Sequence, residues 1–143
     1  MMPTTISLER LNALARFAPE FEHTNFSPGE WTDPVKGEDG TISMPFAQMS
    51  EQAMAFVQAA YDNGWVVGHF DWPSWAGTEA AQRLRDDQAA LARATPDELA
   101  RLLTVVIRQD RFCEGALLEA FTSGLILRIV RRIDVLLKEA QSR

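Results

Sequence analysis

The clearest hydrophobic pattern lies in the C-terminal third of the chain, where apolar residues recur at helical spacing. Thr95 is a good N-cap, Pro96 suits the first helical turn, and Glu98 completes a capping box. The next five apolar positions fall at i, i+3, i+4, i+7 and i+8, which is typical of a helix that buries one face. They are Leu99, Leu102, Leu103, Val106 and Ile107. A helix beginning at Pro96 is therefore predicted.

Two more helices are expected after this one. The apolar stripe pauses around residues 109–111, resumes at Leu117, halts at Ser123-Gly124 and then continues to Leu137. Each resumed stripe keeps the helical period, so each marks a helix with one buried face. We expect the three helices within residues 95–138 to pack against one another.

The N-terminal half shows two further helix patterns, each with its own cap. Ser7 is a good N-cap for a helix over residues 8–17, which Pro19 would end. Ser50 caps a second amphipathic stretch, and Asn63-Gly64 supplies its left-handed stop. Both stretches predict helices that pack on the C-terminal ones.

Shorter helical patterns fill the middle of the chain. One covers residues 78–85, and either Asp86 or Asp87 can cap another that runs through Leu91. A chain of 143 residues is the size of one domain with one hydrophobic core. The predicted fold is therefore mainly α, a single compact helical domain of five to seven helices over residues 1–143.

Residues 20–46 show no sustained period and contain several prolines and glycines, which predicts a long loop. Loops of this length are uncommon in compact domains unless they are functional or held down by large side chains. Within the segment, a short strand is expected only over residues 41–44. The aromatic residues expected to pin the loop to the domain are Phe21, Phe26, Trp31 and Phe46.

The composition is that of an ordinary globular protein, but the net charge of −6 is uneven. Residues 1–80 hold eleven acidic and three basic side chains, a net charge of −8, which leaves +2 for the rest. This acidity argues against nucleic-acid binding and permits a basic protein partner.

The sequence also indicates a cellular location. Cys113 is the one cysteine, and no apolar run approaches the roughly 18 residues of a membrane span, so we expect a cytoplasmic protein.

Three runs of residues carry a resemblance to a known family. They are Trp31 within Gly29-Glu30-Trp31, the run Phe70-Asp71-Trp72-Pro73, and the stretch over residues 95–132 with its DRFCEG and AFTSGL segments. Together they resemble a bacterial family of unknown function, the one numbered 6508. This resemblance covers nearly the whole chain and implies no activity. It also implies a histidine in many members where this chain has Ala116.

The pause after the first C-terminal helix is a first candidate site. If one helix continued through it, Asp110 and Glu114 would share a face as a carboxylate pair or as cation ligands. The structural alternative is that Arg111 braces a helix junction by binding a carboxylate or exposed carbonyl groups. Cys113 beside Arg111 is either a reactive thiol or, by the plainer interpretation, a small buried residue.

An aromatic segment at residues 69–75 is a second candidate site. His69 and Asp71 are either a base with its orienting carboxylate, two ligands of an incomplete metal site, or side chains that bind the backbone. Trp72 and Trp75, together with Trp65, either line a pocket or anchor the long loop. Both interpretations stay open at the level of the sequence.

Residues 99–123 have the rough spacing of a helix-turn-helix. Glu114 and Glu119 would face phosphates in such a motif, which argues against DNA binding. The last helix carries a local basic patch, for which a solvated face is the plain interpretation. This patch consists of Arg128, Arg131 and Arg132.

No sequence motif of a nucleotide site, a nucleophile elbow or a zinc protease is present, so no enzyme class, cofactor or metal is indicated. The leading hypothesis is a cytoplasmic, non-catalytic protein-interaction or regulatory module whose partner is another protein. One alternative is a small-molecule binder or unrecognised enzyme, with a pocket between residues 69–75 and 110–114. Trp31 is a further candidate residue for binding a ligand or a partner. A second is an acidic inhibitor or nucleic-acid mimic. The oligomeric state is not indicated.

Overall fold

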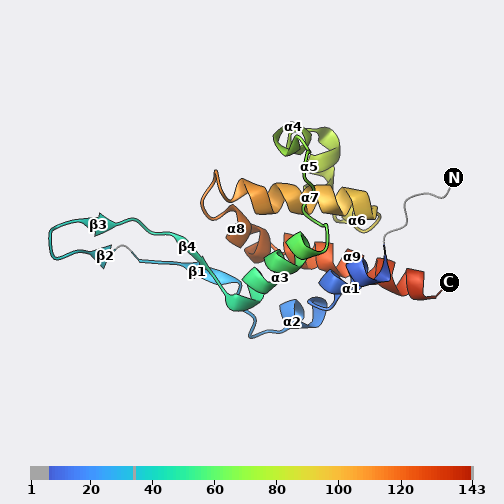
Figure 1. The fold of residues 1–143 in the computed structure, drawn as a ribbon, viewed down its shortest axis with the longest axis horizontal. Coiled ribbons are helices and arrows are strands. Elements are labelled where there is room, and N and C mark those ends of the chain that lie inside the picture. The colour runs from blue at the N-terminus through green and yellow to red at the C-terminus, as the bar shows by residue number, and fades with distance from the viewer. Residues whose placement is uncertain (1–6, 34, 143) are drawn as a thin grey trace.

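Helices form most of the protein in the computed structural model, which describes residues 7–33 and 35–142. Six of the helices in this part of the chain span seven residues or more, which confirms the predicted mainly helical fold. The helices are α1 (Leu8–Ala15), α2 (Ala18–Glu22), α3 (Glu51–Asp62), α4 (Trp72–Ala76), α5 (Glu79–Asp86), α6 (Gln88–Leu91), α7 (Pro96–Gln109), α8 (Ala116–Thr122) and α9 (Leu125–Gln141) (Figure 1).

The segment expected as a long loop holds more secondary structure than its sequence pattern indicated. It contains the end of α2 and three short strands, β1 (Gly29–Trp31), β2 (Val35–Lys36) and β3 (Ile42–Ser43), and a fourth strand, β4 (Ala47–Met49), follows directly after it. Strand β1 pairs with β4, and β2 pairs with β3, both antiparallel. Residues 29–49 thus form a two-stranded ribbon, the hairpin arm, which projects from the helical body (Figure 1). The strand expected within residues 41–44 is β3.

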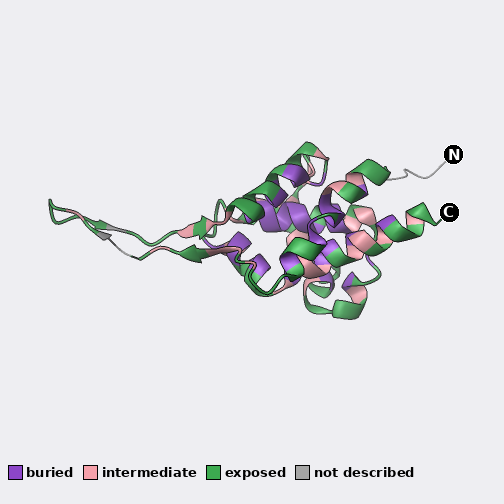
Figure 2. Cartoon of the chain, turned by 90° about the horizontal axis from the view of Figure 1, so that it is seen from below, coloured by how far each residue is buried: buried purple, intermediate pink, exposed green. Residues whose placement is uncertain are grey.

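The C-terminal helix α9 is the centre of the core. Helices α1, α2, α6 and α8 all pack against it. Its buried face is entirely apolar and follows the predicted stripe, so burial of this face excludes water along the length of the body. The residues on this face are Leu125, Ile126, Ile129, Val130, Ile133 and Leu137. Figure 2 shows the buried residues gathered inside the helical body, whereas the arm is exposed.

The expected caps form at the helix starts. Thr95 Oγ1 accepts a hydrogen bond from the Glu98 N–H at 3.2 Å, and Glu98 Oε1 accepts one from the Thr95 N–H at 2.9 Å. Ser7, Ser50 and Asp87 likewise accept hydrogen bonds from the first turns of α1, α3 and α6. These caps confirm the helix starts that the sequence predicted, because each satisfies amide groups that the helix itself leaves unpaired.

One helix boundary differs from its prediction. The helix expected over residues 8–17 ends at Ala15, and Pro19 lies in the first turn of α2. Proline lacks the N–H that the first turn of a helix leaves unpaired, so it begins a helix as readily as it ends one. The chain therefore bends between α1 and α2, which lets α2 pack against α9.

Five phenylalanines join the start of the arm to the body. Phe21 lies at the centre, with ring centroids 4.7 Å from Phe26, 5.4 Å from Phe56 and 5.4 Å from Phe121. Phe17 packs on Phe56 at 5.4 Å in an edge-to-face arrangement. Such aromatic pairs add to the free energy of simple burial. Phe21 and Phe26 therefore pin this segment, as expected from the sequence.

A buried threonine fixes the connection between α3 and α4. Thr104 Oγ1 on α7 accepts a hydrogen bond from the Val67 N–H at 2.8 Å, and its hydroxyl donates to the Ala100 carbonyl at 2.7 Å. Beside it, the fully buried Trp65 donates its Nε1 proton to the Arg10 carbonyl at 2.9 Å. Trp65 is thus a core residue. The sequence had left open whether Trp65, Trp72 and Trp75 line a pocket or pack in the interior.

The tip of the arm is held by a local network. The Thr41 hydroxyl and the Thr41 N–H both donate to Asp39 Oδ1, at 2.7 and 3.1 Å. These two donors, the hydroxyl being the larger cause, hold the pKa of the Asp39 carboxyl below its ordinary value of 3.8. The ionised Asp39 therefore stabilises the turn at neutral pH.

We expect the Thr104→Val substitution to lower the free energy of unfolding by about 1–3 kcal/mol, because the Val67 N–H loses its acceptor inside the protein. Urea unfolding followed by circular dichroism measures the change. Thr122→Val is the matched control: the Thr122 hydroxyl also donates to the carbonyl four residues earlier, at 2.8 Å, but it accepts no hydrogen bond from the described residues. An equal loss in both variants would contradict the role of Thr104.

Titration of the arm tip provides a second prediction. Because the folded pKa of Asp39 lies below its ordinary value, the network stabilises the tip above that value and is lost as pH falls through the folded pKa. Carboxyl carbon chemical shifts measured by NMR against pH report this titration. In Thr41→Val, which lacks the hydroxyl donor, we expect the pKa to rise toward 3.8; an unchanged pKa would contradict the assigned cause.

Candidate functional site

The base of the hairpin arm lies on the connection between α7 and α8. Gly115 in this connection has a φ of 89° and packs so closely under Trp31 that a Cβ atom there would overlap the indole ring. Next to it, Glu114 Oε1 accepts a hydrogen bond from the Ala47 N–H on β4 at 2.9 Å. Both strands at the arm base are therefore held by consecutive residues, and we call Trp31, Ala47, Glu114 and Gly115 the arm seat.

The connection is a tight turn rather than a continuous helix. Helix α7 ends at Gln109, whose carbonyl accepts hydrogen bonds from the N–H groups of Phe112 and Cys113, both at 2.9 Å. Asp110 Oδ1 accepts from the Leu117 N–H at 3.0 Å, in the first turn of α8. The carboxylate-pair hypothesis required one helix through Asp110 and Glu114, and the structure does not meet that condition.

Each residue of the first candidate site thus has its own place. Asp110 satisfies an amide at the start of α8, and Glu114 holds the arm. Arg111, expected to brace the junction, is exposed and makes no side-chain hydrogen bond or ion pair with the described residues. The two carboxylates do the bracing, since Asp110 accepts a hydrogen bond from a backbone N–H of α8 and Glu114 accepts one from a backbone N–H of the arm.

Cys113 and Phe112 both lie on the outside of the turn. The prediction that Cys113 is a small buried residue is wrong, since its side chain is exposed. Phe112 is 79% exposed, the largest fraction among the exposed large hydrophobic residues of the described chain. In this six-residue turn, residues 110–115, Asp110 is half-buried and Gly115 is buried, whereas the four residues between them are exposed.

A cavity of about 610 Å³ lies beside the arm seat. Trp31, Cys113 and Glu114 line this cavity together with residues of α8. No residue of the 69–75 segment lines it. Its lining residues are Trp31, Gln109, Cys113, Glu114, Gly115, Ala116, Leu118, Glu119 and Thr122. The position at which the family resemblance implies a histidine in other members, Ala116, is therefore part of this cavity.

The second candidate segment is organised by α4. Asp71 is the N-cap of this helix, and its Oδ1 accepts from the Ser74 N–H at 3.3 Å. Trp75 packs on Phe70 with ring centroids 5.9 Å apart. His69 is exposed and adopts a φ of 45°, the one positive value among the non-glycine residues described. The Asp71 carboxylate thus caps a helix rather than orienting His69.

The two candidate segments meet through aromatic side chains. The ring of Trp72 lies 6.0 Å from the ring of Phe112, and α4 packs against α7. The polar groups on each side bind backbone elsewhere: Asp71 within α4, and Glu114 on the arm. This contact between residues 69–75 and 110–114 is therefore apolar. Glu114, one of the polar residues that the sequence suggested for a shared pocket, binds the arm instead.

The described residues show no grouping typical of a metal centre. Within residues 7–33 and 35–142, no three His, Cys, Asp or Glu side chains gather as they do around a bound ion. None of the helices in this part of the chain is both long and apolar enough to cross a membrane.

These features define a small helical protein that carries a hairpin arm on a helix junction. The chain belongs to a family of unknown function, DUF6508, whose model matches residues 6–139. No curated protein and no solved structure matches it. The segments that carried the resemblance include Trp31, Glu114 and Gly115 of the arm seat and both residues of the Trp72–Phe112 contact.

Sequence reasoning identified Trp31 and Glu114 but missed their companions. Ala47 takes part through its backbone N–H, which no side-chain pattern reveals. Gly115 reads as an ordinary helix start, since it precedes α8 in the left-handed conformation. Gly124 precedes α9 in the same way, with a φ of 87°. Only the packed structure distinguishes them, because Trp31 covers Gly115 while nothing lies within 4 Å of a Cβ at Gly124.

This pair of glycines provides a matched test of the arm seat. Both Gly115→Ala and Gly124→Ala incur the left-handed strain of about 1–2 kcal/mol. We expect Gly115→Ala alone to displace the Trp31 indole, which moves its N–H resonance in a ¹H–¹⁵N NMR spectrum. Urea unfolding measures the stability of both variants. A Trp31 resonance that stays in place in Gly115→Ala would contradict the packing of the arm on the turn.

Proposed function

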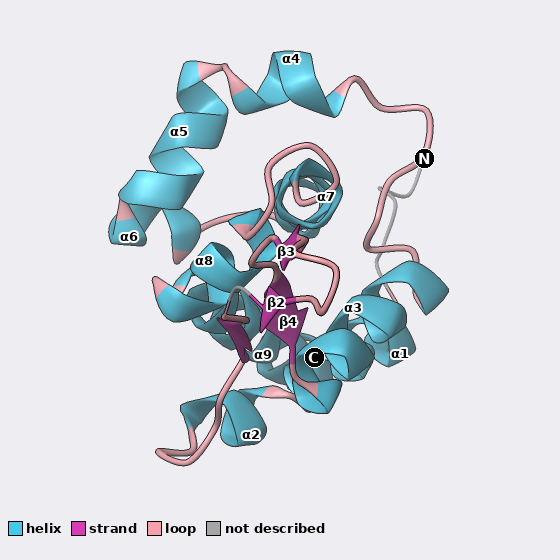
Figure 3. Cartoon of the chain, turned by 90° about the vertical axis from the view of Figure 1, so that its left-hand side faces the viewer, coloured by secondary structure: helices cyan, strands magenta, loops and turns pink. Residues whose placement is uncertain are grey.

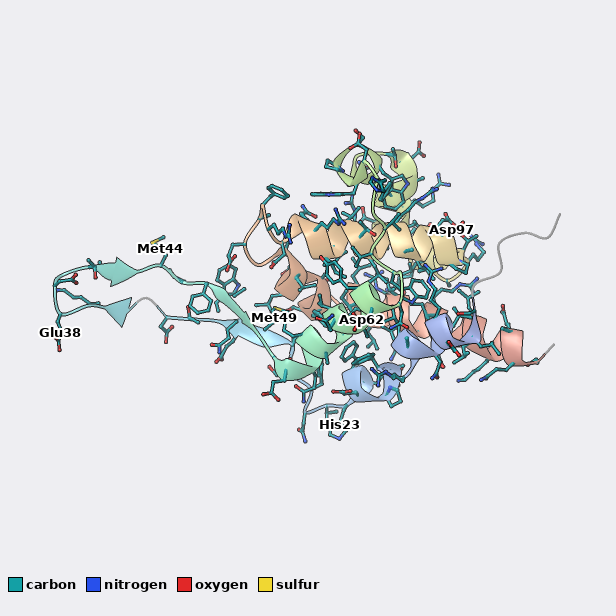
Figure 4. The ribbon with its side chains drawn as sticks, viewed as in Figure 1. His23, Glu38, Met44, Met49, Asp62 and Asp97 are labelled. Carbon is teal, nitrogen blue, oxygen red and sulfur yellow. The ribbon has the colours of Figure 1, made fainter. Side chains whose placement is uncertain are left out.

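We propose that this protein is a cytoplasmic, non-catalytic interaction module that binds another protein through its hairpin arm. The observation that carries the proposal is the exposure of large apolar side chains along a ribbon that stands away from the body. The exposed fractions are 50% for Trp31, 64% for Ile42, 78% for Met44 and 53% for Phe46. Figure 4 shows Met44 and Glu38 on the arm and Met49 at its base.

Exposed apolar side chains of this size gathered on one element are typical of a binding surface. The arm has little core of its own, because its four strands span only two or three residues each. Its folding therefore does not require Ile42, Met44 or Phe46. Burying an apolar side chain of this kind against a partner contributes about 1.5–3 kcal/mol.

Side chains, more than backbone pairing, are the expected contacts. A partner that added a strand to the arm would need a long unbroken edge. The described strand pairs of the arm are short: Gly29–Trp31 pairs with Ala47–Met49, and Val35–Lys36 pairs with Ile42–Ser43. Apolar side chains carried on such short strands fit a cleft in a partner better than they fit the edge of a sheet.

The charge of the arm indicates the chemistry of the partner. Residues 29–49 carry four acidic side chains and only Lys36 as a base, a net charge of −3. A matching surface is an apolar cleft bordered by lysine or arginine, since complementary charge speeds association and excludes acidic competitors. The partner we propose is a protein with such a cleft.

The arm seat contributes by holding the arm in place before binding. Trp31 packs over Gly115, and Glu114 binds the Ala47 N–H at 2.9 Å, so the base of the ribbon is anchored on the body. An element that is already ordered loses less conformational entropy when it binds. Phe112, two residues before Glu114 in the α7–α8 connection, adds exposed apolar surface.

The arm is tested with the double substitution Met44→Ser and Phe46→Ser. Because two exposed apolar side chains are lost, we expect affinity for the partner to fall about a hundredfold while the melting temperature stays close to that of the wild type. The matched control is Tyr61→Ser with Val135→Ser, which removes two exposed apolar side chains from the body.

The partner is first captured with a photo-crosslinking amino acid at position 44, in the full chain, with the same group at position 61 as the reference. A partner that is crosslinked from the arm, binds more weakly at high salt and is lost with the arm variant supports the proposal. Equal capture from both positions would sink it. So would a metabolite that binds at the 610 Å³ cavity while no protein is captured.

A further inference from the structure

A second hollow lies on the outer side of α9, away from its buried face. This cleft has a volume of about 230 Å³ and is formed between α6 and α9. On α9 the lining positions fall at i, i+3, i+4 and i+7, opposite the apolar stripe that faces the core. On the α6 side they fall at i, i+3 and i+4. The lining residues are Gln88, Leu91, Ala92, Arg128, Arg131, Arg132 and Val135.

The three arginines are the ones expected from the sequence to form a solvated face, but two of them are only partly exposed. Arg128 and Arg132 are partly buried. Arg132 donates its Nε proton to the Ala94 carbonyl at 2.9 Å, which ties α9 to the connection before α7. Arg128 donates to the Gly124 and Arg85 carbonyls at 3.4 and 3.5 Å.

These hydrogen bonds fix the positions of the Arg128 and Arg132 guanidinium groups but do not neutralise their positive charges. Among the described residues, neither Arg128 nor Arg132 forms an ion pair, whereas Arg131 pairs with Glu22 at 2.8 Å. Within the same residues, both terminal nitrogens of Arg132 lack a protein acceptor. Two adjacent, partly buried cations without a carboxylate repel each other, and this repulsion is relieved when an anion binds between them.

The remaining lining limits the kind of anion. Leu91 and Ala92 on the α6 side, together with Val135 on α9, supply apolar lining beside the arginines, and Gln88 adds one neutral polar group. A volume of about 230 Å³ holds a small molecule and is too small for a folded protein surface. Guanidinium groups match the oxygens of carboxylates and phosphates with two parallel hydrogen bonds.

We propose that the cleft between α6 and α9 binds a small metabolite that carries a phosphate monoester or a pair of carboxylates. Arg128 and Arg132 bind the oxygens, and the short carbon chain of the ligand packs on Leu91 and Val135. Such a ligand bridges α6 and α9 and stabilises their contact. This site is independent of the arm and lies on another part of the surface, so it adds a ligand to the proposed interaction module.

The full-length protein is titrated with inorganic phosphate and with succinate, in separate experiments, while its melting temperature is followed at constant ionic strength. Phosphate tests the monoester class, and succinate tests the dicarboxylate class. We expect a saturable rise with at least one of them and none with sodium chloride. In Arg128→Gln with Arg132→Gln, the affinity falls by at least about tenfold.

Arg83→Gln is the control, because Arg83 is exposed on α5 and pairs only with Glu79 at 3.1 Å. It retains the rise if the cleft is the site. No saturable rise with either anion, or an equal rise in the control and in the cleft variant, would overturn the proposal.

If the cleft variant does not fold, the proposed anion site is tested in the wild-type protein by NMR of the arginine Nε–Hε groups. Phosphate or succinate then shifts the resonances of Arg128 and Arg132 and leaves that of Arg83 in place. A uniform shift of all three would be a general ionic effect and would contradict a site in the cleft.

Discussion

Burial of the apolar face of α9 is the interaction on which the rest of the structure depends. Helices α1, α2, α6 and α8 each pack against this helix, and its fully buried positions include Ile126, Ile129 and Ile133. Because it contacts elements from both ends of the sequence, α9 sets their positions relative to one another (Figure 3). Its opposite side faces outward and carries the arginines of the α6–α9 cleft. One helix thus supports both the core and a charged surface, by presenting different side chains on its two faces.

The arm depends on that body through two contacts of different kinds. The phenylalanine cluster around Phe21 and Phe26 holds the chain as it leaves α2, and the arm seat holds the base of the ribbon on the α7–α8 turn. The first contact is apolar and continuous with the core. The second combines shape, at Gly115 under Trp31, with one charge-assisted hydrogen bond from Ala47 to Glu114. Beyond these anchors the ribbon is exposed, which is what makes its apolar side chains available to a partner.

Helices were predictable here to the extent that local signals specify them. Thr95 and Glu98 form the expected capping box, and Ser7, Ser50 and Asp87 cap the helices expected of them. The candidate site was predictable only in part. Trp31 and Glu114 were singled out and line the same cavity, but the role suggested for Arg111 falls to carboxylates, and Asp71 caps a helix. The remaining partners act through a backbone N–H and through the absence of a side chain, which leave no periodic signal in a sequence.

The sequence by itself determined the helical class, the caps and the apolar stripes, because each depends on residues within a few positions of one another. Tertiary structure alone decided that residues 29–49 form a projecting ribbon, since strands of two or three residues are too short to show an alternating pattern. It also decided which of two similar left-handed glycines lies under a tryptophan, and that Arg128 and Arg132 line a cleft instead of a solvated face. In each case the deciding neighbour is distant along the chain, so packing of the whole body had to bring it into contact.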